Sequence, residues 1–295
     1  MFDVHAHLTA PELLPHLESL LAEAHSAGVH DILVVSENLQ DAALVLALPT
    51  TQGGVRLHKA LGLHPEYACL EALSAMLTLI RTHHSELTCI GEIGLDYSPH
   101  VLGEKHPEAT KIIQQECMRQ QVVLALELDM AVNVHSRSAG HHALALLRET
   151  AATAIAAAAE EGPEGHERRK RGARAVFHAW DGKAHYAEAA ASDTEHDIYF
   201  SVPPCAQRCP LMSKWIARLP LERLLLETDC PALAPFKGDV NLPKNLGVSV
   251  EVVGIAKGMG MEEIVQATRR NAERLFGLGF ATGMDRGYKK YETTG

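Results

Sequence analysis

Short apolar runs recur along the chain, and the stretches between them place apolar residues at intervals of three and four, as amphipathic helices do. Each run predicts a buried β-strand. Strands that alternate with helices form a parallel sheet through right-handed crossovers. Eight such units predict an α/β fold of the (β/α)8 TIM-barrel class. The expected strands are residues 2–5, 31–35, 57–63, 88–93, 131–135, 174–178, 197–201 and 222–227.

One segment departs from this alternation. Residues 150–173 begin as an alanine-rich helix, continue through a Gly/Pro break and end in the basic run of Arg168, Arg169, Lys170 and Arg171. Two interpretations stay open: a surface extension with a solvated charged loop, or an arm that steers phosphate groups.

The region after the last strand is a Pro-rich loop that runs to about residue 247 and is a candidate wall of the cleft. Two helices, about 248–259 and 261–276, complete the expected fold. We therefore expect a single barrel domain over residues 1–281 and a polar C-terminal tail over 282–295.

The composition is that of an ordinary globular protein, with 295 residues of which 46% are hydrophobic and 22% charged. No apolar run reaches the roughly 18 residues of a membrane span, and the first strand starts too early to leave room for a targeting peptide. The six cysteines lack the density of a disulfide framework, which favours a reducing compartment, cytoplasmic or nuclear. Nothing indicates an obligate protein partner.

The net charge of −10 argues against a broad basic surface that grips long nucleic acid. It leaves open a local basic cleft, particularly one whose positive charge comes from bound metal.

Six potential metal ligands close apolar runs. Because the ends of parallel strands meet at one face of a barrel, a metal site is expected there. An HxH pair on a strand directs both imidazoles to the same face. The six residues are His5, His7, Glu92, His135, His178 and Asp229.

Six motifs in register with these strands resemble the signatures of the TatD family of metal-dependent deoxyribonucleases, within the amidohydrolase superfamily. They are DVHAHL, GLHPE, GEIGLDY, VNVHSR, FHAWDG and ETDCPAL, in that order along the chain. VNVHSRSAG, SVPP and ETDCPALAP are most similar to the eukaryotic TatD-domain-containing branch.

The resemblance implies a site for two divalent ions. The nitrogen and oxygen donors suit Zn, Mg, Mn or Fe and do not decide among them. The resemblance assigns His5, His7 and Asp229 to one ion and His135 and His178 to the other. Glu92 bridges the two ions. Asp229 and Glu92 are then the catalytic carboxylates, and Asp229 also accepts a proton from the attacking water.

Two further residues are implied as substrate-binding. His64, in GLHP, lies near the scissile phosphate as a hydrogen-bond donor. Arg137, in HSR, either contacts a phosphate or pairs with a carboxylate. Two other acids are expected to support the site: Glu227 behind a ligand, and Asp96 as a brace of its own loop.

The chain departs from the family pattern in one loop. Where family members carry Arg-Asn-Glu-Pro, this sequence reads Val240-Asn241-Leu242-Pro243. The arginine is lost, which weakens the expected contact with a DNA backbone, and Lys237 or Lys244 is a candidate replacement.

The expected function is a metal-dependent hydrolase that cleaves DNA phosphodiester bonds with a metal-activated water. Two alternatives stay open. One is hydrolysis of another substrate by the same chemistry, such as a D-aminoacyl-tRNA or an amide or ester. The other is a catalytically silent metal-binding scaffold.

Overall fold

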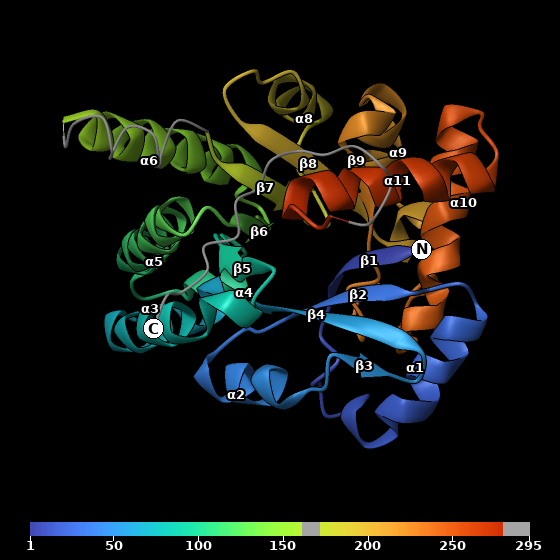
Figure 1. Cartoon of the computed structure of the whole chain (residues 1–295). Coiled ribbons are helices and arrows are strands. Elements are labelled where there is room, and N and C mark those ends of the chain that lie inside the picture. The colour runs from blue at the N-terminus through green and yellow to red at the C-terminus, as the bar shows by residue number, and fades with distance from the viewer. Residues whose placement is uncertain (161–171, 280–295) are drawn as a thin grey trace.

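The computed structural model describes residues 1–160 and 172–279. Eight parallel strands surround a central axis, and helices cover their outer side (Figure 1). The expected TIM-barrel class is therefore confirmed. The strands, in their order around the barrel, are β1 (Phe2–Ala6), β2 (Asp31–Val35), β4 (Val55–Leu61), β5 (Cys89–Gly94), β6 (Ala131–His135), β7 (Arg174–Phe177), β8 (Asp197–Val202) and β9 (Leu224–Leu226).

One additional strand was not expected from the sequence. Residues Thr51–Gln52 form β3, which pairs antiparallel with the start of β4 at the edge of the barrel.

The helices lie between the strands and after them. They are α1 (Leu17–Ser26), α2 (Leu39–Ala47), α3 (Leu70–His83), α4 (Pro99–Leu102), α5 (Pro107–Glu127), α6 (Gly140–Glu160), α8 (Ala184–Ala191), α9 (Pro210–Arg218), α10 (Leu246–Lys257) and α11 (Met261–Phe276). Short 3-10 turns are η1 (Leu14–His16), η2 (Pro65–Tyr67), η3 (His84–Glu86), η4 (Pro204–Arg208), η5 (Leu221–Arg223) and η6 (Pro243–Asn245).

The alanine-rich helix expected from residue 150 is part of α6, which already begins at Gly140. The basic run from Arg168 to Arg171 and the tail over 282–295 lie outside the described residues. Within the described part of the chain, no helix combines the length and apolar character that crossing a membrane requires.

The barrel interior changes from apolar to polar along its axis. At the amino ends of the strands, buried side chains such as Val4, Leu33 and Leu225 form a cluster with the last turns of α11. Phe276 of α11 packs on Phe2, with ring centroids 6.0 Å apart. Inward-facing positions of a strand recur at every second residue. The inward-facing side chains nearer the carboxyl ends of the strands are the polar ones. This end of the barrel is therefore sealed, and the site lies at the other.

The seam between β9 and β1 is closed by the segment that follows β9. Asp229 N–H donates to the His5 carbonyl at 2.9 Å, and His7 N–H donates to the Cys230 carbonyl at 2.9 Å. The buried Asp3 carboxylate accepts from Thr228 N–H at 2.9 Å. These bonds fix the two ends of the barrel sheet to each other.

Candidate metal centre

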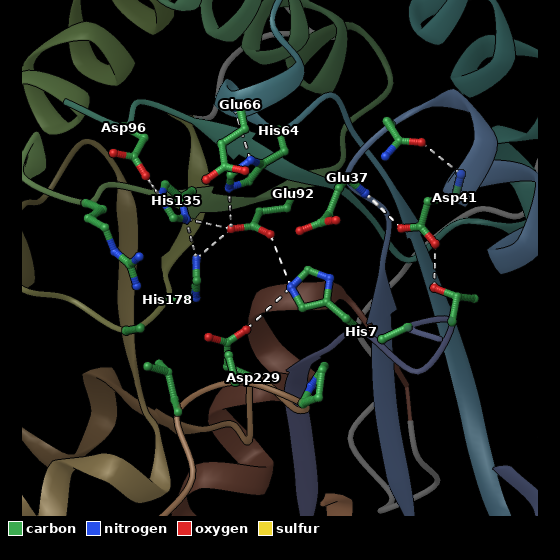
Figure 2. A pocket seen from close by; sticks show the side chains of 18 of the residues that line it. His7, Glu37, Asp41, His64, Glu66, Glu92, Asp96, His135, His178 and Asp229 are labelled. Carbon is green, nitrogen blue, oxygen red and sulfur yellow. Dashed lines mark hydrogen bonds and ion pairs between the residues drawn. The ribbon is translucent and has the colours of Figure 1, made fainter. Parts of the chain in front are cut away.

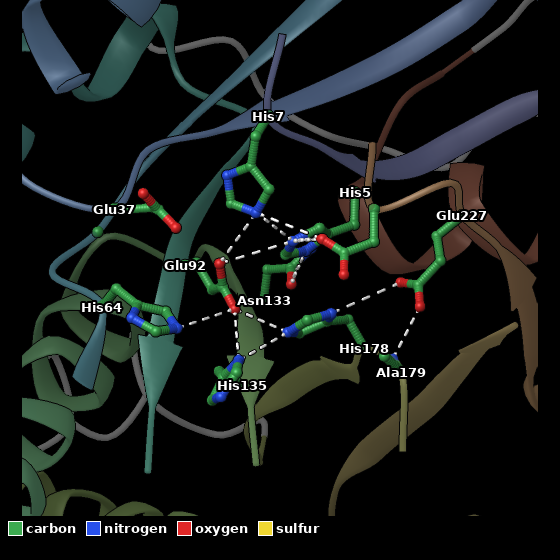
Figure 3. Close-up of polar contacts among 12 residues, drawn as sticks. His5, His7, Glu37, His64, Glu92, Asn133, His135, His178, Ala179 and Glu227 are labelled. Carbon is green, nitrogen blue, oxygen red and sulfur yellow. Dashed lines mark hydrogen bonds and ion pairs between the residues drawn. The ribbon is translucent and has the colours of Figure 1, made fainter. Parts of the chain in front are cut away.

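The six ligand candidates converge at the carboxyl ends of the strands (Figures 2 and 3). In the first group, His5 Nε2 and His7 Nε2 lie 3.1 Å apart, and each lies 3.4 Å from Asp229 Oδ1. Glu92 Oε2 lies 3.6 Å from His5 Nε2 and 3.4 Å from His7 Nε2. Four donor atoms from three parts of the chain therefore face one point.

The spacing of these four atoms suits a divalent ion. A tetrahedral zinc ion with bonds of about 2.0–2.1 Å holds its ligand atoms about 3.3–3.4 Å from one another. Two neutral imidazole nitrogens at 3.1 Å cannot satisfy each other when both offer lone pairs, whereas a cation between them satisfies both. The donor set thus fits a metal on geometry and on chemistry.

A second group forms on the other oxygen of Glu92. Glu92 Oε1 lies 2.8 Å from His135 Nδ1 and 2.7 Å from His178 Nε2, and these two nitrogens are 3.2 Å apart. Glu92 therefore directs one carboxylate oxygen to each group, as a bridging ligand does. The structure brings all six residues together, and His178 also lies within reach of His5 and Asp229, so their division between two ions stays a prediction.

Charge within the site favours a cation. Burial alone would raise the pKa of Glu92, but His64, His178 and His5 around it hold that pKa well below its usual value. Burial would lower the pKa of His5, and the carboxylates of Glu92 and Asp229 outweigh it and raise the pKa to about 10. Burial and the nearby His5 lower the pKa of His178 to about 4, so this ring is neutral and offers a lone pair.

Buried hydrogen bonds select the ring nitrogen that faces the site. Asn133 donates its amide to the Val4 carbonyl at 2.9 Å, so its oxygen accepts from His5 Nδ1 at 2.9 Å and leaves Nε2 for the centre. Asp96 accepts from His135 Nε2 at 3.1 Å and leaves Nδ1 for the centre. Asp96 also accepts from Ser98 N–H at 2.8 Å, so it braces its own loop as expected.

Glu227 lies behind His178. Its carboxylate accepts from the Ala179 N–H at 2.8 Å and from the Ser201 hydroxyl, and it lies 3.9 Å from His178 Nδ1. Burial raises the pKa of Glu227 to about 8. The side chain therefore anchors the backbone that follows a ligand, which is the supporting position that its place in the sequence suggested.

Local backbone geometry aims the ligands. The register of β1 with β2 is irregular between Asp3 and Ala6, and that of β5 with β6 is irregular between Ile90 and Ile93. Irregularities of this kind redirect side chains near active sites. Gly94 has φ +145° and lies so close to His135 that a Cβ there would be 2.0 Å from the His135 carbonyl oxygen. Only glycine permits this approach of β5 to β6.

His64 lies beside the second group, and its ring comes close enough to Glu92 and His135 for the three side chains to share an ion. Its Nδ1 accepts from the Glu66 N–H at 3.2 Å, so the neutral ring carries its proton on Nε2, which lies 3.6 Å from Glu92 Oε1. Burial lowers the pKa of His64 to about 3, which keeps the ring neutral. A neutral ring with a proton on Nε2 can donate a hydrogen bond into the site, as the sequence implied.

The centre opens into a cavity of about 610 Å³. Its lining includes Arg137, Glu37, Glu66 and Asp181 as well as the ligand candidates His7, Glu92, His135, His178 and Asp229. Arg137 is exposed, and within residues 1–160 and 172–279 its guanidinium pairs with no carboxylate. Of the two interpretations of Arg137, the pairing with a nearby carboxylate is therefore not observed.

The loop after β9 is anchored by its asparagine. The buried Asn241 donates its amide to the Thr228 carbonyl at 2.7 Å, and its backbone N–H donates to the Pro231 carbonyl at 2.8 Å. Lys244 pairs instead with Glu23 at 2.7 Å, and neither Lys237 nor Lys244 lines the cavity. Neither lysine therefore takes the place of the missing arginine at the cavity wall, and a contact of either with a DNA backbone stays a prediction.

Two residues of the site were missed in the sequence. Asn133 lies two positions before His135 on the same strand face, so the alternation of β6 could have identified it. Glu37 follows β2 at the same strand-end level as the ligands, and its carboxylate points toward the centre (Figure 2). Its signal was an acid two residues after an apolar run, similar to the signal of Asp229, which lies three residues after Leu226.

Comparison with known proteins points in one direction. A family model described as TatD related DNase matches residues 2–277. The human protein named deoxyribonuclease TATDN3 is 32% identical over 284 residues, covering 94% of each chain. A Bacillus subtilis protein named uncharacterized metal-dependent hydrolase YabD is 29% identical and covers 94% of this chain and 98% of its own. The crystal structure of YjjV, a TatD homologue from Escherichia coli, superposes with a TM-score of 0.77 at 27% identity, covering 95% and 98% of the two chains.

Proposed function

Because the chain belongs to the family of TatD-related DNases, we propose that it hydrolyses DNA phosphodiester bonds at the metal centre described above. One observation carries the proposal: Glu92 lies between two groups of donors, with one carboxylate oxygen toward each. Paired metal sites of this design are common in phosphodiester hydrolysis.

We assign two divalent ions to the site. His5, His7 and Asp229 would hold one ion, His135 and His178 the other, and Glu92 both. When bound, the ions polarise the phosphate and lower the pKa of a water molecule. The imidazole donors suit zinc, and the carboxylates also suit manganese and magnesium, so the donor set does not select one metal.

The residues of the chain supply the remaining chemistry. The water oxygen forms a bond to phosphorus while the bond from phosphorus to the leaving oxygen breaks. Asp229 accepts one proton of the water, since its carboxylate faces the first group, and then passes that proton to the leaving oxygen. His64 donates Nε2–H, and Arg137 donates from the rim, to phosphate oxygens. Both contacts hold the substrate for in-line attack.

The test uses metal-stripped protein reloaded with zinc, manganese or magnesium and assayed on end-labelled single-stranded and duplex DNA. Cleavage is expected with at least one ion. Glu92→Ala and Asp229→Ala are each expected to reduce the rate by about 100-fold or more. Glu251→Gln, an exposed acid on α10 outside the cavity, is the matched control and keeps the wild-type rate.

A mis-acylated tRNA in the same assay separates the rival hydrolase. Metal-dependent deacylation with intact DNA would overturn the nuclease proposal in favour of that activity. Metal binding without hydrolysis of either substrate would indicate a scaffold. All six cysteines are free thiols, which supports a reducing location, and we place the protein in the cytoplasm or nucleus.

A further inference from the structure

Charge is unevenly distributed around the cavity. Four carboxylates line it on the segments that follow β1, β2 and β4: Glu12, Glu37, Asp41 in the first turn of α2, and Glu66. Asp96 and Asp181 line it on the Arg137 side, where each accepts a backbone hydrogen bond. Among the described lining residues the only lysine or arginine is Arg137, which follows β6. Since β4 and β5 separate β2 from β6 in the barrel, the acidic side and the basic residue lie on different sides of the cavity.

Glu37 is the member of the acidic side that remains available to a substrate. Its N–H donates to Asp41 Oδ2 at 3.0 Å, and its carbonyl accepts from His64 N–H at 2.8 Å, so the backbone is fixed on both sides. Its carboxylate points toward the centre near His7 and Glu92 (Figure 3). Within the described residues this carboxylate has no hydrogen-bond or ion-pair partner.

Asp41 and Glu66 differ in this respect, and Glu12 is exposed. Asp41 is occupied, because it accepts from Thr9 Oγ1 at 2.5 Å as well as from Glu37 N–H. Glu66 is exposed at the rim and lies 3.6 Å from His100 Nε2. A carboxylate that is fixed in position, directed into the cavity and without a donor accepts a hydrogen bond from a hydroxyl group and repels a phosphate.

We propose that Glu37 determines which strand ends the enzyme accepts, by taking a hydrogen bond from a free terminal hydroxyl. The nucleotide on the Glu37 side of the scissile bond is then the last of its strand, because a further phosphate would meet the carboxylates of that side. The remaining, polyanionic strand leaves past Arg137. This inference rests on the proposed nuclease function and specifies its substrate as a hydroxyl-terminated strand.

The experiment compares one single-stranded sequence in four forms: hydroxyl groups at both ends, a 3′-phosphate, a 5′-phosphate, and a closed circle. Wild-type enzyme is expected to cleave the hydroxyl-ended strand about 10- to 100-fold faster than the circle. The same difference is expected relative to one of the two phosphorylated strands. Glu37→Gln keeps the size of the side chain and removes the charge, and is expected to reduce this preference to about threefold or less. Glu251→Gln removes the same charge outside the cavity and keeps the preference.

A binding measurement supplies a second readout. Fluorescence anisotropy measures the binding of labelled strands to Asp229→Ala, which is expected to bind hydroxyl-ended strands more tightly. Adding Glu37→Gln to this variant is expected to abolish that preference. Equal cleavage of all four forms by the wild type would overturn the proposal, as would a preference that Glu37→Gln leaves unchanged.

Bis(p-nitrophenyl) phosphate, a small diester without a strand end, separates the two proposals. Wild type and Glu37→Gln are expected to hydrolyse it at rates within about twofold. If the wild type hydrolyses this diester and cleaves circles as fast as linear strands, only the end selection fails. If it hydrolyses neither the diester nor any oligonucleotide, the proposed function itself fails.

Discussion

Asp96 Oδ2 lies 3.1 Å from His135 Nε2, and this contact leaves His135 Nδ1, 2.8 Å from Glu92 Oε1, as the nitrogen that faces the second group. A carboxylate behind a histidine fixes its tautomer and raises its basicity as a ligand. In the proposed metal centre, Asp96 would therefore act through His135 and not by direct ligation.

We predict that Asp96→Ala weakens the binding of one of two divalent ions by about 10- to 100-fold and leaves the other nearly unchanged. Asp96→Asn is the matched variant, because its amide oxygen can still accept from His135 Nε2, and a smaller loss is expected. Titration calorimetry and the metal content of the purified protein measure both. Equal affinities in the wild type and Asp96→Ala would show that Asp96 only braces its loop.

Metal removal is predicted to lower the free energy of unfolding. An ion that binds only the folded state adds about 2.7 kcal/mol when its free concentration is 100 times its dissociation constant. Urea unfolding with a chelator and with excess zinc or manganese measures the difference. Glu92→Ala removes the ligand shared by both groups. Added metal is therefore expected to raise the free energy of unfolding of this variant much less than that of the wild type. A wild-type transition that does not move when metal is added would contradict the assigned site.

Arg137→Ala is predicted to raise KM for single-stranded DNA by about tenfold, with little change in metal content. A charge-assisted hydrogen bond to phosphate contributes about 1.5–3 kcal/mol, and 1.4 kcal/mol corresponds to a factor of ten. Arg137→Lys keeps the charge without the forked geometry and is expected to recover part of the loss. An unchanged KM in the alanine variant would remove Arg137 from the substrate contacts.

Asp31→Asn is predicted to destabilise the protein by about 1–3 kcal/mol at neutral pH. The buried Asp31 carboxylate accepts from Arg56 Nε at 2.8 Å and lies 3.1 Å from His58 Nε2 and 3.3 Å from Arg269. Burial would raise its pKa, but the bonds from His58 and Arg56 outweigh burial and lower the pKa below 3.8.

The sign of the pH dependence follows from that lowered pKa. The contribution of Asp31 is present above pH 3.8 and is lost as the pH falls through the lower pKa of the folded state. The difference between wild type and Asp31→Asn is therefore expected to shrink on acidification below about pH 4, in denaturant unfolding measured across pH. A difference that stays constant would rule out the ionised carboxylate as its source.

The sequence was sufficient for the barrel and for the convergence of the ligands, because both depend on a simple rule. Buried parallel strands are continuous apolar runs, and a ligand that ends such a run must lie at the same face as the others. His5 and Asp229 are far apart in the chain, yet both were placed at one mouth for this reason alone. Short β3 was missed, since Thr51 and Gln52 carry no apolar run.

Interactions between side chains were harder to predict. That Asp96 would reach His135 depends on how β5 pairs with β6, whose register is irregular near Ile90. That Asn133 would orient His5 depends on a contact across the barrel interior, because β1 and β6 are not neighbours in the sheet. The free carboxylate of Glu37 was missed because an acid after a strand is usually solvated or capped. Its availability follows from what Asp41 already binds, which only the folded arrangement shows.

The closure of the seam constrains how the protein matures in the cell. Asp3 and Thr228, which bond across it, are 225 residues apart in the chain, and the donors His5, His7 and Asp229 lie beside them. A chain still emerging from the ribosome therefore lacks a complete first site until the last strand, β9, has been made. Metallation of that site must follow synthesis of the barrel, so cofactor loading is a late event in the life of each molecule.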